Sequence, residues 1–307
     1  MADVSGKVAG IMRMIAAGDY FIINRPRQYG KTTILSLLEK KIAESDRFLP
    51  VRISFETLDA QTYRNYDRFI ETFLGKISTE LQRYNRGDLV SVIGQAPRPM
   101  DNFYRLELLL EQLNEKEKSI VLMIDEVDKA SNNQLLLDFL GLLRGKYLER
   151  NDEKGSAFHS VILAGVHDIK TLKSKIRDDG EEKFNSPWNI AAPFDIDMGL
   201  NTREIASLLT AYSREKNIGM DIPAISEKIF YYTSGYPFLV SYTCKLLDER
   251  VLPGKTSWHK DDVETAVNRL LKESNTNFDS LVKNLENNPE LYAFIKTIAV
   301  EGEMVSF

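Results

Sequence analysis

The sequence YFIINRPRQYGKTT at residues 20–33 has the order of a buried strand, a loop and the beginning of a helix. The apolar run Tyr20–Ile23 predicts a short strand, the loop ends in GKTT, and the apolar residues Ile34–Leu38 predict an amphipathic helix. This order is typical of a phosphate-binding P-loop. Backbone N–H groups of such a loop and the positive end of the helix dipole face the same point, which favours a polyanion there.

The P-loop pattern assigns roles to two residues of this stretch and departs at a third. We expect Lys31 to reach the β- and γ-phosphates of a nucleotide and the Thr32 hydroxyl to bind Mg²⁺. The pattern G-x-x-x-x-G-K-[ST] requires its first glycine where this sequence has Arg25. Gly30 is retained where the backbone must pass close to phosphate. The alternative is a surface turn with a chance Gly-Lys pair.

A second motif, SIVLMIDEVDK at residues 119–129, strengthens the first. Ile120–Ile124 is a continuous apolar run, which predicts a parallel strand buried on both faces. Asp125 and Glu126 follow it at the carboxyl end of the strand, where ligands bind in open α/β folds. This looks like a Walker B element, in which Asp125 holds Mg²⁺ and Glu126 orients and deprotonates the attacking water. An acidic turn after a strand is common alone, but it does not explain the two motifs together.

Composition restricts the class of protein. The chain has 307 residues, 43% of them apolar and 28% charged, as in soluble globular proteins of one large or two medium domains. The net charge of −5 provides no overall attraction to nucleic acid or to an anionic membrane. Cys244 is the only cysteine, which excludes an internal disulfide and suits a reducing compartment. Because the sequence has neither a signal segment nor an apolar run of about 20 residues, we expect a cytoplasmic protein.

Strand and helix patterns alternate in the first two thirds of the chain. We expect an α/β fold with a parallel five-stranded sheet flanked by helices. A loop is predicted for residues 86–101, which contain two glycines and two prolines. The strands are predicted at Tyr20–Ile23, Val51–Phe55, Ile120–Ile124, Ser160–Val166 and Pro193–Met198.

The strand pattern ends near residue 200, and helical patterns follow. We therefore expect a P-loop domain at residues 1–199, a helical lid at 200–255 and a further helical segment at 256–307. The last segment stops at Phe307 within an element, so we expect the chain to be truncated there.

The loop sequence RPRQYGKTT at residues 25–33, with the Asp125-Glu126 pair, resembles the ASCE branch of P-loop ATPases. It resembles still more closely the RPRxxGKT/S loop of bacterial and archaeal AAA-like ATPases of the STAND group, the signal-transduction ATPases with numerous domains. The sequence SGYPFL at 234–239 is similar to the Gly-x-Pro element of the STAND helical lid, where the proline lies against the adenine. The resemblance covers about residues 10–250.

The resemblance implies an enzyme that binds ATP and Mg²⁺. It implies metal ligation by Thr32 and Asp125, and catalysis by Lys31 and Glu126. It also implies a polar sensor residue after the strand Ser160–Val166, for which we take His167, with Asp168 as an alternative and a solvent-facing strand end as another. The residues implied to contact the nucleotide are Arg27, Gln28, Tyr29, Gly30, Lys31, Thr32, Thr33 and Pro237.

Some assignments stay open at this level. An arginine finger is not fixed, because Arg27, Arg144, Arg177 or an arginine of a neighbouring subunit would serve. The aromatic stretch Tyr231–Tyr242 is typical of core packing more than of base stacking. Within it Gly235-Tyr236-Pro237 is a stronger candidate for base contact, because its glycine and proline break the helix and expose backbone. The resemblance further implies that the helical segment at 256–307 begins a winged-helix-like or effector module.

Three functions are compatible with these features. The first is a slow ATPase that acts as a molecular switch and couples its nucleotide state to a C-terminal domain or a protein partner, as a monomer or a homo-oligomer. The second is a DNA-associated ATPase with the layout of replication initiators, which the acidic residues of 258–300 disfavour. The third is a nucleotide-binding scaffold without turnover, which would not require Glu126. The absence of an Asn-Lys-x-Asp motif makes ATP a better substrate than GTP, and no acceptor-site motif of a small-molecule kinase is present.

Overall fold

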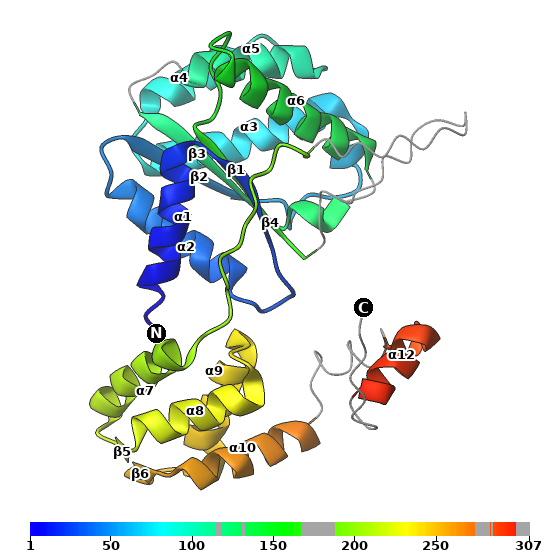
Figure 1. Ribbon diagram of the computed structural model, residues 1–307. Coiled ribbons are helices and arrows are strands. Elements are labelled where there is room, and N and C mark those ends of the chain that lie inside the picture. Colours follow the sequence, from blue (N-terminus) through cyan, green and yellow to red (C-terminus); the bar gives the residue numbers. More distant parts are fainter. Residues whose placement is uncertain (115–117, 131–132, 167–187, 274–282, 284, 299–307) are drawn as a thin grey trace. The chain divides into compact units, whose positions relative to one another are not determined.

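The computed structural model describes the chain except for residues 115–117, 131–132, 167–187, 274–282, 284 and 299–307 (Figure 1). The chain divides into two compact units, which we call the sheet unit and the helical unit. The sheet unit contains Asp3–Gly199 and the short segment Tyr236–Phe238. The helical unit contains Met1–Ala2, Leu200–Gly235 and the residues from Leu239 onward. None of the helices in the described ranges is both long and apolar enough to span a membrane.

The sheet unit is built on parallel strands that place the two motifs at one edge. The strand order is β1-β4-β3-β2, so β4 separates β1, which precedes the GKTT loop, from β3, which ends at Asp125. Every residue of β4 is buried, and so is every residue of β3 except the first, as expected for strands covered on both faces. The strands are β1 (Tyr20–Asn24), β2 (Phe48–Ser54), β3 (Ser119–Asp125) and β4 (Ser160–Gly165).

Helices cover both faces of this sheet, which confirms the predicted α/β class. One core lies between the sheet and α1 and α2, and it receives Val121 and Met123 of β3. The other core lies against α3 to α6 and receives Ile120, Leu122 and Ile124 (Figure 1). The helices are α1 (Ser5–Ala17), α2 (Lys31–Ala43), α3 (Tyr66–Arg83), α4 (Gly87–Gln95), α5 (Phe103–Asn114) and α6 (Gln134–Asn151), with short 3-10 turns η1 (Thr62–Arg64) and η2 (Val127–Ala130).

The prediction of five strands is wrong for the described residues, in which this sheet has four. The segment predicted as the fifth strand follows a single bridge between Phe21 and Ala192. Beyond that bridge, Phe194 stacks on Phe21 with ring centroids 5.8 Å apart, and the Ile196 carbonyl accepts a hydrogen bond from the Arg25 side chain. Side-chain contacts of this kind produce the alternating apolar pattern of a strand without a backbone ladder.

The loop predicted for residues 86–101 is also partly wrong, because it contains α4. Leu89 and Ile93 lie one turn apart on this helix and are buried in the core. The two glycines, Gly87 and Gly94, lie at the first and penultimate positions of the helix, and Pro97 follows it. Glycine and proline therefore mark the ends of this helix, although their density in the sequence predicted a loop.

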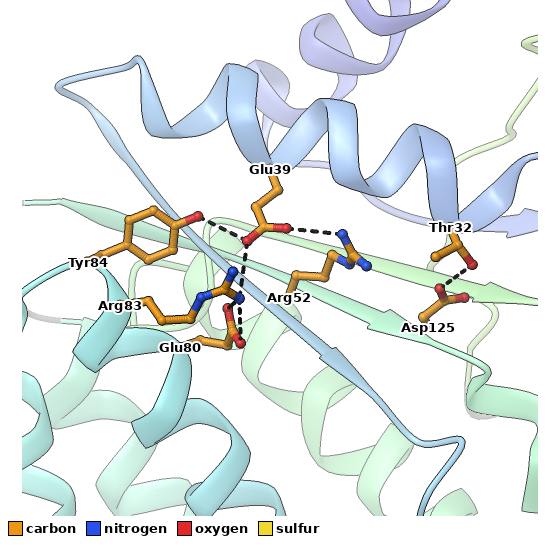
Figure 2. A network of polar contacts seen from close by, with 7 residues as sticks. All are labelled: Thr32, Glu39, Arg52, Glu80, Arg83, Tyr84 and Asp125. Carbon is orange, nitrogen blue, oxygen red and sulfur yellow. Dashed lines mark hydrogen bonds and ion pairs between the residues drawn. The ribbon is translucent and has the colours of Figure 1, made fainter. Parts of the chain in front are cut away.

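A network of charged and hydroxyl groups joins α2, β2 and α3 on the sheet unit (Figure 2). The Glu39 carboxylate, which is 12% exposed, accepts hydrogen bonds from Arg52 at 3.1 Å and from the Tyr84 hydroxyl at 3.1 Å. Arg83 lies 3.8 Å from the same carboxylate and also pairs with Glu80. Because β2 pairs only with β3 among the described strands, the network spans an edge of the sheet and fastens the P-loop helix to α3.

We expect Glu39→Ala to lower the free energy of unfolding by about 2 kcal/mol, between the values for exposed and for fully buried ion pairs. The reason is that Arg52 and Tyr84 lose a shared, nearly buried acceptor. Urea denaturation measures the change. Glu44→Ala is the control, because Glu44 is 66% exposed and pairs only with the exposed Lys41 in the recorded ion pairs. Equal effects of the two substitutions would contradict a stabilising role for the network.

The helical unit consists mainly of short helices. Its first helix, α7, begins with a capping box between Asn201 and Glu204. Two short strands, β5 (Gly219–Met220) and β6 (Ser257–Trp258), pair in parallel and were not predicted. The helices are α7 (Thr202–Lys216), α8 (Ile222–Thr233), α9 (Pro237–Leu246), α10 (Lys260–Lys272) and α12 (Pro289–Lys296), with a π-helical turn at Leu247–Val251. From residue 256 onward the described elements are β6, α10 and α12, and these do not show the winged-helix module that was predicted.

Candidate functional site

The loop at residues 25–30 joins β1 to α2 and presents the amino end of that helix. Gly30 is the N-cap residue and has a φ of 80°, a left-handed conformation that favours glycine. The Ile34 N–H donates to the Gly30 carbonyl at 2.9 Å and begins the helical ladder. Thr32 and Thr33 are exposed on the first turn. The first N–H groups of a 13-residue helix therefore face outward at this point, where an anion is stabilised.

Lys31 lies across this loop. Its ammonium donates to the carbonyls of Arg25 at 2.8 Å and Pro26 at 3.0 Å, and the residue is 5% exposed. Burial lowers the pKa of Lys31, while the carboxylates of Glu126, Asp125 and, less strongly, Asp128 act in the opposite direction. A partly desolvated cation held by neutral carbonyls can exchange these partners for phosphate oxygens, which bind it more strongly.

Thr32 and Asp125 lie 93 positions apart in the sequence and are in direct contact (Figure 2). The Thr32 hydroxyl donates to the Asp125 carboxylate at 2.8 Å. Asp125 is 4% exposed and stands at the end of β3, so its position is fixed by the sheet. A hydroxyl and a carboxylate are hard oxygen ligands, and a pair of them beside an anion site fits Mg²⁺, which keeps its other ligands as water and phosphate.

Glu126 follows on a strained turn. Its φ is 53°, an uncommon value for a residue other than glycine. The side chain is half-buried, and its pKa is raised by burial first and by the neighbouring Asp125 second, with Asp128 adding to the effect and Lys31 opposing it. A carboxylate with a raised pKa beside a cation has the properties of a general base.

Arg25, which replaces the first glycine of the P-loop pattern, directs its side chain to another part of the sheet unit. The guanidinium donates to the carbonyls of Asn24 at 2.8 Å and Ile196 at 3.2 Å, and lies 5.6 Å from the centre of the Phe194 ring. Its backbone N–H meanwhile donates to the Gly165 carbonyl of β4 at 3.2 Å. The departure from the pattern therefore adds an anchor for the segment around Ile196.

The other nucleotide-contacting residues that were predicted lie on the same loop or on the segment 236–238. Arg27 and Gln28 are exposed, and Gln28 has a positive φ of 57°. Tyr29 is half-buried and stacks on Tyr236, with ring centroids 5.1 Å apart. Pro237 is the first residue of α9 and is half-buried.

Tyr236, part of the predicted Gly235-Tyr236-Pro237 candidate for base contact, is bonded to the P-loop. Its hydroxyl donates to the Arg27 carbonyl at 2.6 Å, a contact that the sequence did not predict. Burial is the main cause that raises the pKa of this hydroxyl, which keeps it a donor. Tyr231 of the same stretch is 75% exposed, so the predicted core packing is wrong for Tyr231.

Three further residues bear on the predicted site. His167, predicted as the sensor, and its alternative Asp168 lie outside the described residues. Asp128 was not singled out, although it is buried next to Glu126 and acts on the pKa of Lys31 and Glu126. The only sequence signal was a third carboxylate in DEVD at residues 125–128.

Comparisons with known proteins bear on the fold and on the family. We found no match among curated protein sequences. The Walker-type ATPase PABY2304 of Pyrococcus abyssi has a similar structure, with a TM-score of 0.55, 15% identity, and coverage of 94% of this chain and 77% of that chain. The ORC2 protein of Aeropyrum pernix, in ADPNP–ADP complexes, has a TM-score of 0.50, 15% identity, and coverage of 89% and 69%. At these identities the similarity shows the fold alone.

The match to a protein family covers far more of the chain than the sequence motifs do. The family model for the AAA-like domain matches residues 9–306, which is almost the whole chain. The protein therefore belongs to the AAA-like domain family.

Proposed function

We propose that this protein binds and slowly hydrolyses Mg-ATP and works as a molecular switch of the STAND type. The observation that carries the proposal is the contact of Thr32 with Asp125 at the amino end of α2, with Lys31 lying across the same loop. Two motifs far apart in the sequence thus supply an anion site, a cation and a pair of oxygen ligands within one edge of the sheet. The ATPase fold of the similar structures is consistent with this proposal.

The chemistry follows from the residues of the sheet unit. Lys31 exchanges the carbonyls of Arg25 and Pro26 for β- and γ-phosphate oxygens and neutralises charge that develops on them. Thr32 and Asp125 hold Mg²⁺, which supplies further positive charge at the phosphates when it is bound. Glu126 accepts the proton of the attacking water, and His167 acts as the sensor of the γ-phosphate.

The proposed nucleotide contacts lie on the P-loop and at Pro237. Backbone and side chains of the P-loop surround the phosphates, and Pro237 lies against the adenine. Tyr236 is bonded to the Arg27 carbonyl and is continuous in the chain with α8 and α9. A change in the loop on ATP binding therefore reaches the lid through this hydrogen bond and the chain on either side of Tyr236. The proposed contacts are Arg27, Gln28, Tyr29, Gly30, Lys31, Thr32, Thr33 and Pro237.

The proposed organisation has an ATPase domain at 1–199, a helical lid at 200–255 and a segment at 256–307 that leads to a winged-helix or effector module. The lid passes the nucleotide state to that module or to a protein partner, in the manner of an ordered switch segment. The net charge of −5 disfavours the DNA-associated alternative, because DNA phosphates bind basic surfaces.

The direct test is steady-state phosphate release by the wild type with ATP or GTP, in Mg²⁺ and in excess EDTA. We expect saturable release from ATP that stops in EDTA, and weaker release from GTP. ATP binding without turnover would contradict hydrolysis and favour a nucleotide-binding scaffold. Equal rates with ATP and GTP would contradict the proposed preference for ATP.

A prediction about the metal follows from the Thr32–Asp125 contact. Thr32→Val, which keeps the shape and removes the hydroxyl, is expected to raise the Mg²⁺ concentration for half-maximal turnover about 10-fold, the effect of losing one ligand of about 1.4 kcal/mol. A Mg²⁺ titration of phosphate release measures the shift. Thr32→Ser retains the hydroxyl and should behave like the wild type. An unchanged titration curve for Thr32→Val would exclude Thr32 as a ligand.

A further inference from the structure

Asp128 connects the turn that carries Glu126 to the carboxyl end of β4. It lies on η2, two residues beyond Glu126, and is 7% exposed. Its carboxylate accepts a hydrogen bond from the backbone N–H of Val166 at 2.8 Å. Val166 directly follows β4 and precedes His167 in the sequence. One side chain thus joins the segment after β3 to the end of the neighbouring strand.

The position opposite Asp128 favours glycine. A Cβ atom at Gly165 would lie 2.7 Å from Asp128 Oδ1 and 2.8 Å from its Cγ, closer than real Cβ contacts allow. Gly165 does not have a positive φ, so the requirement comes from the close approach of the carboxylate. The end of β4 is therefore shaped to receive the Asp128 side chain.

The turn between Asp125 and Asp128 needs such an anchor. Glu126 has a φ of 53°, and a residue in this conformation persists only where its surroundings hold it. On one side, Asp125 is fixed by Thr32 and by the Phe55 N–H, which donates to the Asp125 carbonyl at 2.9 Å. On the other side, Val127 is fully buried and Asp128 is bonded to Val166. Asp128 supplies the polar fastening on the second side.

We propose that Asp128 is a positioning residue for hydrolysis, which acts by holding the Glu126 turn against the end of β4 through its bond to Val166. This inference rests on the proposed ATPase function. Asp128 has no assigned contact with the substrate, so its loss slows the chemical step and leaves nucleotide binding intact. A displacement of a general base by about 1 Å is enough to lower a rate about 100-fold.

The test compares Asp128→Ala, Asp128→Asn and Gly165→Ala in the full chain, with folding checked by circular dichroism. For Asp128→Ala we expect kcat for ATP to fall about 10- to 100-fold while the Kd for ATP stays within about 3-fold. Asp128→Asn keeps an acceptor for the Val166 N–H and is expected to retain kcat within about 5-fold. Gly165→Ala, which pushes on the carboxylate from the opposite side, should lower kcat as Asp128→Ala does.

The double variant Asp128→Ala with Gly165→Ala makes the coupling explicit. Because removing the carboxylate also removes the clash, the double variant should be no slower than Asp128→Ala alone. If the two single-variant losses in kcat multiply in the double variant, the proposal is overturned. A kcat for Asp128→Asn as low as that for Asp128→Ala would overturn it too, since the charge and not the bond to Val166 would then matter.

Amide hydrogen exchange at Val166 separates this inference from the proposed function. The Val166 amide should exchange at least about 10-fold faster in Asp128→Ala than in the wild type, and it should stay protected in Asp128→Asn. If the wild type does not hydrolyse ATP, the proposed function and the role of Asp128 in hydrolysis both fail. The exchange result then still decides whether Asp128 fastens the turn, and unchanged exchange in Asp128→Ala would overturn that as well.

Discussion

Glu126→Gln is expected to lower kcat for ATP hydrolysis about 100- to 10,000-fold and to leave ATP affinity nearly unchanged, because this is the range for loss of a general base. The glutamine side chain keeps the size and the hydrogen-bonding capacity of glutamate but cannot accept a proton from water. The partial burial of Glu126 and, after it, the neighbouring anions raise its pKa, and these features make it a good proton acceptor. Phosphate release and equilibrium binding of ATP, measured on the same preparation, give the two quantities.

Glu56→Gln is the matched control for this result. Glu56 is an exposed carboxylate whose charge also acts on the pKa of Glu126, but its side chain has no assigned part in the mechanism. Its substitution should change kcat less than about 3-fold. If Glu126→Gln turned over ATP as fast as Glu56→Gln, Glu126 would not be the base.

Lys31→Ala is expected to weaken ATP binding about 100-fold, which corresponds to about 2.7 kcal/mol for a charge-assisted contact to phosphate. The Lys31 ammonium bonds across the P-loop, to the Arg25 and Pro26 carbonyls. Turnover should be lost with binding, because the same cation neutralises the charge that develops on the γ-phosphate. Titration calorimetry with Mg-ATP measures the affinity.

The control for Lys31→Ala is Lys40→Ala, which removes an exposed cation from the far end of the same helix. This control separates a local contact from a general effect of net charge. Affinity equal to that of the wild type is expected for Lys40→Ala. Equal affinities for Lys31→Ala and the wild type would remove the physical basis of the P-loop assignment.

Local patterns predicted the elements of the sheet unit well. The apolar run before GKTT and the run before Asp125 predicted β1 and β3, because strands buried on both faces leave a continuous apolar signal. The fifth strand was wrong because Phe194 and Ile196 pack against Phe21 and Gly10 without a ladder, and a packed extended segment has the same alternation. Periodicity reports side-chain burial and does not report backbone pairing.

The contacts between distant segments could not be predicted in the same way. Asp128 meets Gly165 and Val166 because the strand order places β4 beside β3. No local sequence pattern predicts that order. The bond from Tyr236 to the Arg27 carbonyl joins residues 209 positions apart. Local sequence identifies which residues have suitable chemistry, and the topology decides which of them meet.

The measurement that tests the proposed ATPase mechanism most directly is ATP-dependent phosphate release by the wild type and Glu126→Gln, with ATP binding measured on both. We expect saturable, Mg²⁺-dependent release by the wild type, and binding without release by Glu126→Gln. Failure of both proteins to bind ATP in the presence of Mg²⁺ would contradict the mechanism.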